Sequence, residues 1–189
     1  MGSLNSIMEF SGIDDLSSNE LKVLFKRARA KRDSHWGRRI SYSRKVFVPL
    51  TNYCRDDCGY CTFVKRPGDK GARIMTPDQV MQVVNAGEAV DAKEVLFSLG
   101  EKPELRYHEV RAELLALGHT RMVDYLHQMC AQVLRDSSLL PHVNAGTLTE
   151  SELSLLKPVS GSMGMMLESV SRRLTEKGQS HYGCPDKVP

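Results

Sequence analysis

The stretch Lys45-Val46-Phe47-Val48-Pro49-Leu50, followed after three residues by Cys54-Arg55-Asp56-Asp57-Cys58-Gly59-Tyr60-Cys61, decides the fold. The first part is a short apolar run rich in β-branched residues, which predicts a buried strand. The second part is a polar loop that carries three cysteines in a C-x3-C-x2-C array. Three cysteines this close together suit a metal site better than a disulfide framework. The sequence therefore predicts a metal centre in the loop that follows a strand.

The cysteine array favours an iron–sulfur cluster over the other common thiolate site, structural zinc. Iron–sulfur clusters are bound by cysteine thiolates, and three cysteines of one loop can hold three corners of a cubane cluster. The fourth iron then has no protein ligand, which leaves a position for a substrate. In the zinc alternative, a histidine or a distant cysteine such as Cys184 completes four ligands. Zinc ribbons usually show paired C-x2-C knuckles, and this sequence has no second knuckle.

Composition and charge exclude several classes of protein. The chain has 189 residues, of which 41% are hydrophobic and 26% are charged, close to the averages of globular domains. Its net charge of +3 gives no strong electrostatic basis for binding nucleic acid or an anionic membrane. No stretch approaches the roughly 18 consecutive apolar residues of a spanning helix, and no signal-peptide run opens the sequence. We expect a cytoplasmic protein without nucleic acid or membrane partners.

Downstream of the cysteine loop the sequence repeats one pattern, a capped helix followed by a compact apolar run. This alternation is typical of βα units around a parallel sheet. Thr76 and Thr149 each precede a glutamine or glutamate by three residues, which predicts a capping box at two helix starts. Cys130 lies on an apolar helical stripe and is expected in the core. The expected strands are 45–50, 94–99, 139–145 and 163–167, and the expected helices are 76–87, 107–117, 122–133, 149–156 and a segment from 171 onward.

The amino-terminal residues 1–40 are expected to form a helical extension, and residues 41–189 the core domain. Ser17 and Glu20 fit a capping box at the start of the extension's helix. Apolar residues then recur at helical spacing and predict one buried stripe. The stripe comprises Leu21, Leu24, Phe25 and Ala28.

The cysteine array, with Tyr60 before its last cysteine, resembles the signature of the radical S-adenosylmethionine (SAM) superfamily. Several further segments, in the same order, resemble the first subunit of the FO synthase family. FO is 7,8-didemethyl-8-hydroxy-5-deazariboflavin, the chromophore of deazaflavin coenzymes. The resemblance runs from about residue 41 to the end of the chain. The segments are Tyr42–Phe47, Cys61–Phe63, Leu99–Glu104, Leu140–Gly146, Gly164–Glu168, His181–Gly183 and Pro185–Lys187.

The resemblance implies an α/β fold, a partial radical-SAM (β/α)6 TIM-like barrel, and two cofactors, a [4Fe-4S] cluster and SAM. Cys54, Cys58 and Cys61 would hold the cluster, whose open iron chelates the amino and carboxylate groups of SAM. One electron then yields a 5′-deoxyadenosyl radical. That radical would act on an adduct of tyrosine and 5-amino-6-ribitylaminouracil, and ring closure with loss of ammonia, a lyase reaction, gives FO. The family continues past residue 189, so the chain is expected to be truncated after about four to five βα units.

A carboxylate and a glycine follow the second predicted strand. Gly100 and Glu101 resemble the superfamily's Gly-Gly-Glu motif, with Leu99 in place of the first glycine. The resemblance implies that Glu101 meets the ammonium of the methionine part of SAM. The carboxyl ends of parallel strands gather at the mouth of such a barrel, which supports this placement. The alternative is an ordinary exposed loop carboxylate.

The remaining cofactor contacts are assigned on the same basis. Glu168 ends the fourth predicted strand and is the candidate for the ribose or methionine part of SAM, with the same exposed-carboxylate alternative. Tyr60 is expected to contact adenine mainly through its backbone. Asn144 is a weaker candidate; it shares a strand face with His142, because residues two apart lie on one side. The methionines Met165 and Met166 are expected to be packing residues, and the sequence names no catalytic acid or base.

The resemblance also implies partners. The adduct, a small-molecule substrate, would come from FO synthase subunit 2, which is separate in some organisms and fused in others. The electron would come from a donor such as ferredoxin or flavodoxin. Two alternatives stay open: the partner subunit itself or a menaquinone-pathway radical SAM relative, and a non-catalytic metal-binding fragment.

Overall fold

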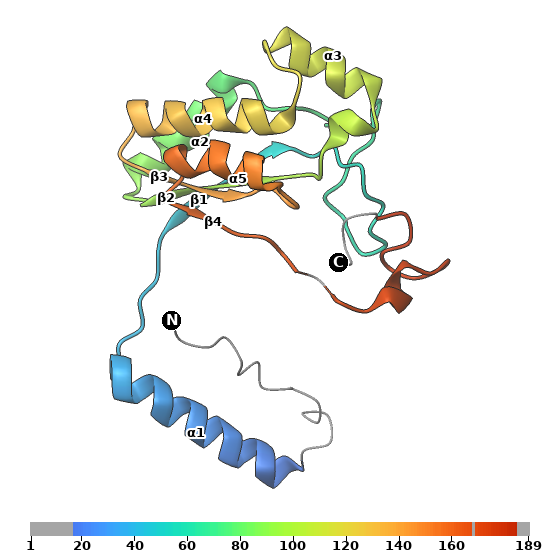
Figure 1. Ribbon diagram of the computed structural model, residues 1–189. Helices are drawn as coiled ribbons and strands as arrows, with labels where there is room; N and C mark the ends of the chain where they lie inside the picture. Colours follow the sequence, from blue (N-terminus) through green and yellow to red (C-terminus); the bar gives the residue numbers. More distant parts are fainter. Residues whose placement is uncertain (1–16, 168, 185–189) are drawn as a thin grey trace. The chain divides into compact units, whose positions relative to one another are not determined.

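A parallel sheet of four strands organises the larger of the two units, Ser43–Pro189, in the computed structural model (Figure 1). The structure describes residues 17–167 and 169–184. The strands follow one another across the sheet in chain order, and every neighbouring pair is parallel. This order is the α/β arrangement expected from the alternation of helices and apolar runs. The strands are β1 (Lys45–Thr51), β2 (Glu94–Leu99), β3 (Leu140–Asn144) and β4 (Ser162–Met163).

The crossover connections contain the expected helices. The Thr76 hydroxyl accepts a hydrogen bond from the Gln79 amide, and the Thr149 hydroxyl accepts one from the Glu152 amide, so both predicted capping boxes are confirmed. The helices are α2 (Pro77–Ala89), α3 (His108–Ala116), α4 (Met122–Asp136) and α5 (Glu150–Leu156). Short 3-10 turns are η1 (Pro103–Leu105), η2 (Lys157–Val159) and η3 (Arg172–Thr175).

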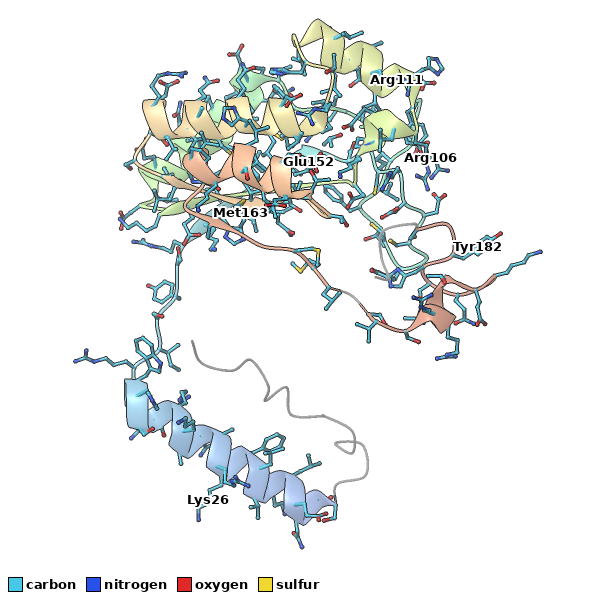
Figure 2. The ribbon with its side chains drawn as sticks, viewed as in Figure 1. Lys26, Arg106, Arg111, Glu152, Met163 and Tyr182 are labelled. Carbon is cyan, nitrogen blue, oxygen red and sulfur yellow. The ribbon has the colours of Figure 1, made fainter. Side chains whose placement is uncertain are left out.

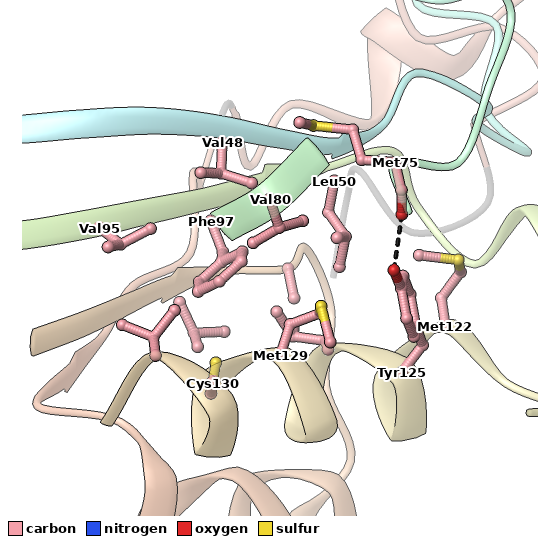
Figure 3. Close-up of a cluster of buried hydrophobic side chains, with 14 of the residues drawn as sticks. Val48, Leu50, Met75, Val80, Val95, Phe97, Met122, Tyr125, Met129 and Cys130 are labelled. Atoms are coloured by element: carbon pink, nitrogen blue, oxygen red, sulfur yellow. Dashed lines mark hydrogen bonds between the residues drawn. The ribbon is translucent and has the colours of Figure 1, made fainter. Parts of the chain in front are cut away.

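The hydrophobic core lies between one face of the sheet and helices α2, α4 and α5 (Figures 1 and 3). Alternate residues of the strands point into it because successive side chains of a strand face opposite sides. Cys130 is fully buried there, as predicted. The Tyr125 hydroxyl, also buried, donates a hydrogen bond of 2.6 Å to the Met75 carbonyl (Figure 3). The strand residues in this core include Val48, Leu50, Val95, Phe97 and Val143.

The other face of the sheet is only partly covered. Phe47 and Leu140 lie on it and are half exposed. In a closed barrel this face would be the interior. The four strands form an open sheet, with β1 at one edge and β4 at the other.

The fourth strand is much shorter than the sequence predicts. A strand was expected over 163–167, but β4 ends at Met163, and one further amide, of Gly164, donates to the Val143 carbonyl. Strands need a neighbour for their backbone groups, and β3 itself ends at Asn144. The helix expected from 171 onward is likewise only the 3-10 turn η3.

The smaller unit, Met1–Tyr42, contains α1 (Ser18–Trp36) in its described part. Its capping box is confirmed, because the Ser17 hydroxyl accepts from the Glu20 amide and the Glu20 carboxylate accepts from the Ser17 amide. The predicted buried stripe is wrong, since α1 has no buried residue. A helix buries apolar residues only against a second element, and the described part of this unit has none. Across the described residues, no helix is long and apolar enough to cross a membrane.

The end of β2 passes unusually close to the strand-to-loop junction after β1. The Gly100 amide donates to the Thr51 carbonyl at 3.3 Å. A Cβ atom on Gly100 would lie 1.8 Å from the Tyr53 carbonyl oxygen and 2.8 Å from the Cys54 Cβ. Only glycine fits at this position, because the obstructing atom belongs to the backbone.

Replacing Gly100 with alanine is expected to destabilise the fold by about 3 kcal/mol, since the new methyl group must push two backbone segments apart. Chemical denaturation followed by circular dichroism measures the effect. Gly59→Ala is the matched control, because its Cβ would lie 3.5 Å from Ser180, an ordinary contact. A Gly100→Ala variant as stable as the Gly59→Ala variant would contradict the close approach.

Candidate metal and cofactor site

A cavity of about 410 Å³ lies where the cysteine loop meets the carboxyl ends of β2 and β3. Seven of the eight predicted site residues line it. Glu168, the eighth, lies outside the described residues. The lining residues that the sequence predicted are Cys54, Cys58, Tyr60, Cys61, Gly100, Glu101 and Asn144.

Hydrogen bonds fix the cysteine loop against the end of β2. The Arg55 amide donates to the Glu101 carbonyl at 2.9 Å, and the Cys61 amide donates to the Cys58 carbonyl at 3.0 Å in a tight turn. Side chains add a second support from outside the cavity. The Asp57 carboxylate pairs with Arg66 and, at 2.8 Å, with Arg106, which Figure 2 labels. Backbone hydrogen bonds and ion pairs therefore hold the loop in addition to the contacts that its thiols make.

Two backbone amides contact the half-buried thiol of Cys54. Its Sγ accepts hydrogen bonds from the Glu101 amide at 3.2 Å and the Asp56 amide at 3.4 Å. Burial raises the pKa of the Cys54 thiol, while these two hydrogen bonds act in the opposite direction. Amide donors to sulfur stabilise the thiolate that a metal requires and tune iron–sulfur sites. The Cys54 thiol is therefore expected to release its proton to solvent when a metal ion binds its sulfur.

Glu101 is buried and oriented, with a side chain only 3% exposed. Its Oε2 accepts a hydrogen bond of 2.9 Å from the Thr147 amide. Gly146, at φ +72°, makes room for it, because a Cβ there would lie 2.0 Å from the same oxygen. The exposed-carboxylate alternative is therefore wrong for Glu101. The turn after β3 holds a carboxylate at the wall of the cavity.

The other predicted residues differ in how they meet the cavity. Tyr60 is 54% exposed and Asn144 is half-buried at the end of β3. His142 shares the strand face of Asn144 as predicted, but its Nδ1 lies 2.6 Å from the Ser162 hydroxyl and it does not line the cavity. Met165 and Met166 were expected to pack; they are instead more than half exposed and line the cavity.

Sequence reasoning missed several residues around the cavity. Thr147 acts through its backbone amide, which leaves no signature in its side chain. Gly146 follows the predicted strand Leu139–Ala145 directly, so its position was the available signal. The other lining residues that were not predicted as site residues are Phe63, Val64, Ser98, Leu99 and Leu167.

The residues present fit an iron–sulfur cluster and SAM. Three cysteine thiols line this cavity, and amide groups already point at one of the sulfurs. Cysteine thiolates are the ligands that such clusters use. The same cavity is also lined by the oriented carboxylate of Glu101 and by Gly100, an arrangement that suits a ligand with an ammonium group. The same cavity can therefore hold a cluster and a small cationic molecule side by side.

FO synthases are among the known proteins that are similar to this chain. The chain is 50% identical to the FO synthase of Mycobacterium tuberculosis (strain CDC 1551 / Oshkosh) over 155 residues, which are 79% of this chain and 18% of that protein. It is 40% identical to the 7,8-didemethyl-8-hydroxy-5-deazariboflavin synthase of Methanopyrus kandleri over 150 residues, 79% of this chain and 45% of that protein. The chain thus spans less than half the length of either relative.

Solved structures share the fold at low sequence identity. The structure of HydG, a maturase of the [FeFe]-hydrogenase, matches with a TM-score of 0.68 at 22% identity, covering 91% of this chain and 35% of HydG. HydG of Carboxydothermus hydrogenoformans gives a TM-score of 0.67 at 20% identity, covering 92% of this chain and 37% of that one. These matches confirm the α/β architecture as part of a larger fold.

The family model for the radical SAM superfamily matches residues 48–182, which include the end of β1 from Val48, the cysteine loop and every strand that follows. Members of this superfamily use a [4Fe-4S] cluster and SAM, and this chain provides a cysteine-rich site at the expected place. The fold, the site and the match agree, and the chain belongs to the radical SAM superfamily.

Proposed function

We propose that this chain is part of a radical SAM lyase that makes FO, the reaction of 7,8-didemethyl-8-hydroxy-5-deazariboflavin synthase. The observation that carries the proposal is the meeting of three cysteines and a buried, oriented glutamate at one cavity, in a chain 50% identical to an FO synthase. The substrate is the adduct of tyrosine and 5-amino-6-ribitylaminouracil. Its conversion to FO releases ammonia.

The cysteine loop is the proposed cluster site, with Cys54, Cys58 and Cys61 as ligands. When bound, the cluster and SAM supply the electron transfer and the 5′-deoxyadenosyl radical that the reaction needs. The cysteine loop would provide three thiolates and leave the fourth iron of the cluster without a protein ligand. The amides of Asp56 and Glu101 stabilise the Cys54 thiolate.

The walls of the cavity are the proposed SAM site. The Glu101 carboxylate is held by the Thr147 amide and can accept a hydrogen bond from the ammonium of SAM. Gly100 exposes the backbone at the end of β2 to the cavity, and Asn144 offers a side-chain amide from the end of β3. Tyr60, on the rim, is the proposed adenine contact. Glu168 is kept as the proposed ribose or methionine contact.

Partners are proposed from the lengths of the relatives. A stretch of similar size is 18% of the mycobacterial FO synthase and 45% of the Methanopyrus protein, so the mycobacterial chain is more than twice as long. This difference supports a subunit 2 that is fused in one case and separate in the other. The electron donor is proposed to be a ferredoxin or flavodoxin. A cytoplasmic location is proposed because the cysteine array suits a metal centre better than a disulfide framework, and such centres suit a reducing compartment.

Anaerobic reconstitution with iron and sulfide is expected to load about four irons per chain, the content of a cubane cluster. Each of three single substitutions should reduce the iron content severely, because each removes one of three ligands. These are Cys54→Ser, Cys58→Ser and Cys61→Ser. Iron analysis and the visible absorbance of the cluster measure the result. Cys130→Ala is the control, since Cys130 is buried in the core away from the loop. Full iron loading in the three serine variants would exclude the ligand assignment.

Changing Glu101 to glutamine should weaken SAM binding to the reconstituted protein about tenfold, because a neutral amide replaces the carboxylate facing an ammonium group. The glutamine oxygen can still accept from Thr147, so the fold is expected to persist. Glu104→Gln is the matched control: Glu104 is also buried and accepts from the Met122 amide at 3.2 Å, but it does not line this cavity. Equilibrium dialysis gives both affinities, and equal values would contradict the role of Glu101.

The substrate assignment is tested with the protein expressed from its complete reading frame. Supplied with the tyrosine adduct, SAM and a low-potential reductant, it should produce FO, which fluorescence detects, and one ammonia. The partner subunit and the menaquinone-pathway relatives act on other substrates. Cleavage of SAM without FO would therefore refute the substrate assignment while leaving the cluster chemistry intact.

A further inference from the structure

A second group of metal-ligating side chains lies against the cysteine loop. Cys58, His181 and Cys184 each offer one ligand atom, and these atoms lie within 4.8 Å of one another. Cys58 is also a proposed cluster ligand. His181 and Cys184 come from the turn after η3, more than 100 residues further along the chain. Neither of them is used by the proposed function.

Backbone contacts hold this turn in place. The Gly59 amide, next to Cys58, donates to the Ser180 carbonyl at 2.7 Å. The His181 amide donates to the Leu174 carbonyl at 2.8 Å, and the Cys184 amide closes the turn on the His181 carbonyl at 3.1 Å. Tyr182, labelled in Figure 2, lies on the same turn. Backbone hydrogen bonds alone thus hold the turn of His181 and Cys184 against the cysteine loop.

The spacing of the two sulfur atoms suits a shared metal ion. Cys58 Sγ lies 3.5 Å from Cys184 Sγ. Two zinc–sulfur bonds of about 2.3 Å at a tetrahedral angle place their sulfurs about 3.8 Å apart. The side chain of Cys184 is buried, so the pair is largely shielded from water. Little movement is needed to admit a cation between them.

His181 supplies an independent sign of a missing ligand. It is only 3% exposed, and its buried Nδ1 makes no hydrogen bond with any described residue. Buried polar atoms are normally satisfied, so an exception calls for a partner. The ring is held edge-on against Tyr60, with centroids 5.5 Å apart and planes at 86°. A metal ion is the partner that an imidazole nitrogen beside two thiols can take.

We propose that Cys58, His181 and Cys184 bind one Zn²⁺ ion in the cluster-free chain, with water in the fourth position. Two thiolates and an imidazole form a donor set that zinc prefers. On binding, the two thiols release their protons to solvent. Because Cys58 belongs to both donor sets, the zinc ion and the cluster exclude one another; this second part rests on the cluster ligands proposed above.

Cobalt substitution tests the site without relying on activity. Co²⁺ added to the oxygen-free, cluster-free full chain should give sulfur-to-cobalt charge-transfer and tetrahedral d–d bands at one equivalent, and Zn²⁺ should abolish them. Cys184→Ser and His181→Asn should each weaken binding at least tenfold, whereas Cys54→Ser should bind as the unchanged chain does. The absence of a tetrahedral cobalt spectrum in the unchanged chain would overturn the site. So would unchanged affinity in the Cys184→Ser and His181→Asn variants, once circular dichroism shows that they are folded.

Iron loading tests the exclusion separately. One equivalent of Zn²⁺ added before reconstitution should suppress iron loading in the unchanged chain but not in Cys184→Ser, which keeps all three proposed cluster ligands. Equal iron loading with and without Zn²⁺ would overturn the exclusion. Failure of the unchanged chain to load iron even without Zn²⁺ would count against the proposed function, whereas the cobalt spectrum would still decide the zinc site.

Discussion

The close approach of Gly100 to the Tyr53 carbonyl is the constraint on which the site depends. A Cβ at this position would lie 1.8 Å from that oxygen, so the end of β2 reaches the start of the cysteine loop only with glycine there. This close approach of the two backbones lets the next residue, Glu101, make two hydrogen bonds with the loop. Its carbonyl accepts from the Arg55 amide, and its amide donates to the Cys54 sulfur. One backbone crossing thus brings the thiols and the carboxylate to the same cavity.

The cysteine loop is supported at three points by residues that are distant from it in the sequence. The end of β2 bonds to it at Arg55, Arg106 pairs with Asp57, and the turn at Ser180 accepts from Gly59. None of these contacts uses a thiol of Cys54, Cys58 or Cys61 as a donor. The scaffold is therefore compatible with metal-free and metal-bound states, and a loop of this kind can receive its metal after folding.

The position of Cys184 changes how the zinc alternative is understood. The sequence presented structural zinc and an iron–sulfur cluster as competing descriptions of one cysteine array. The structure instead separates two overlapping donor sets that share Cys58, one along the loop and one across to the turn that carries His181 and Cys184. On the two proposed assignments, the shared Cys58 thiol makes binding of zinc and binding of the cluster mutually exclusive.

The sequence by itself determined the elements whose signals are local. The capping boxes at Ser17, Thr76 and Thr149 fixed three helix starts, because the bonds involved span only three residues. The short spacing of the three cysteines likewise indicated a metal site in the cysteine loop, and apolar runs indicated β1, β2 and β3. Only the tertiary structure decided what depends on distant partners: that β4 ends at Met163, beside the end of β3, that α1 has no buried residue, that the Thr147 amide holds Glu101, and that Cys184 lies 3.5 Å from Cys58. Such contacts join residues up to 126 positions apart, and no local pattern encodes them.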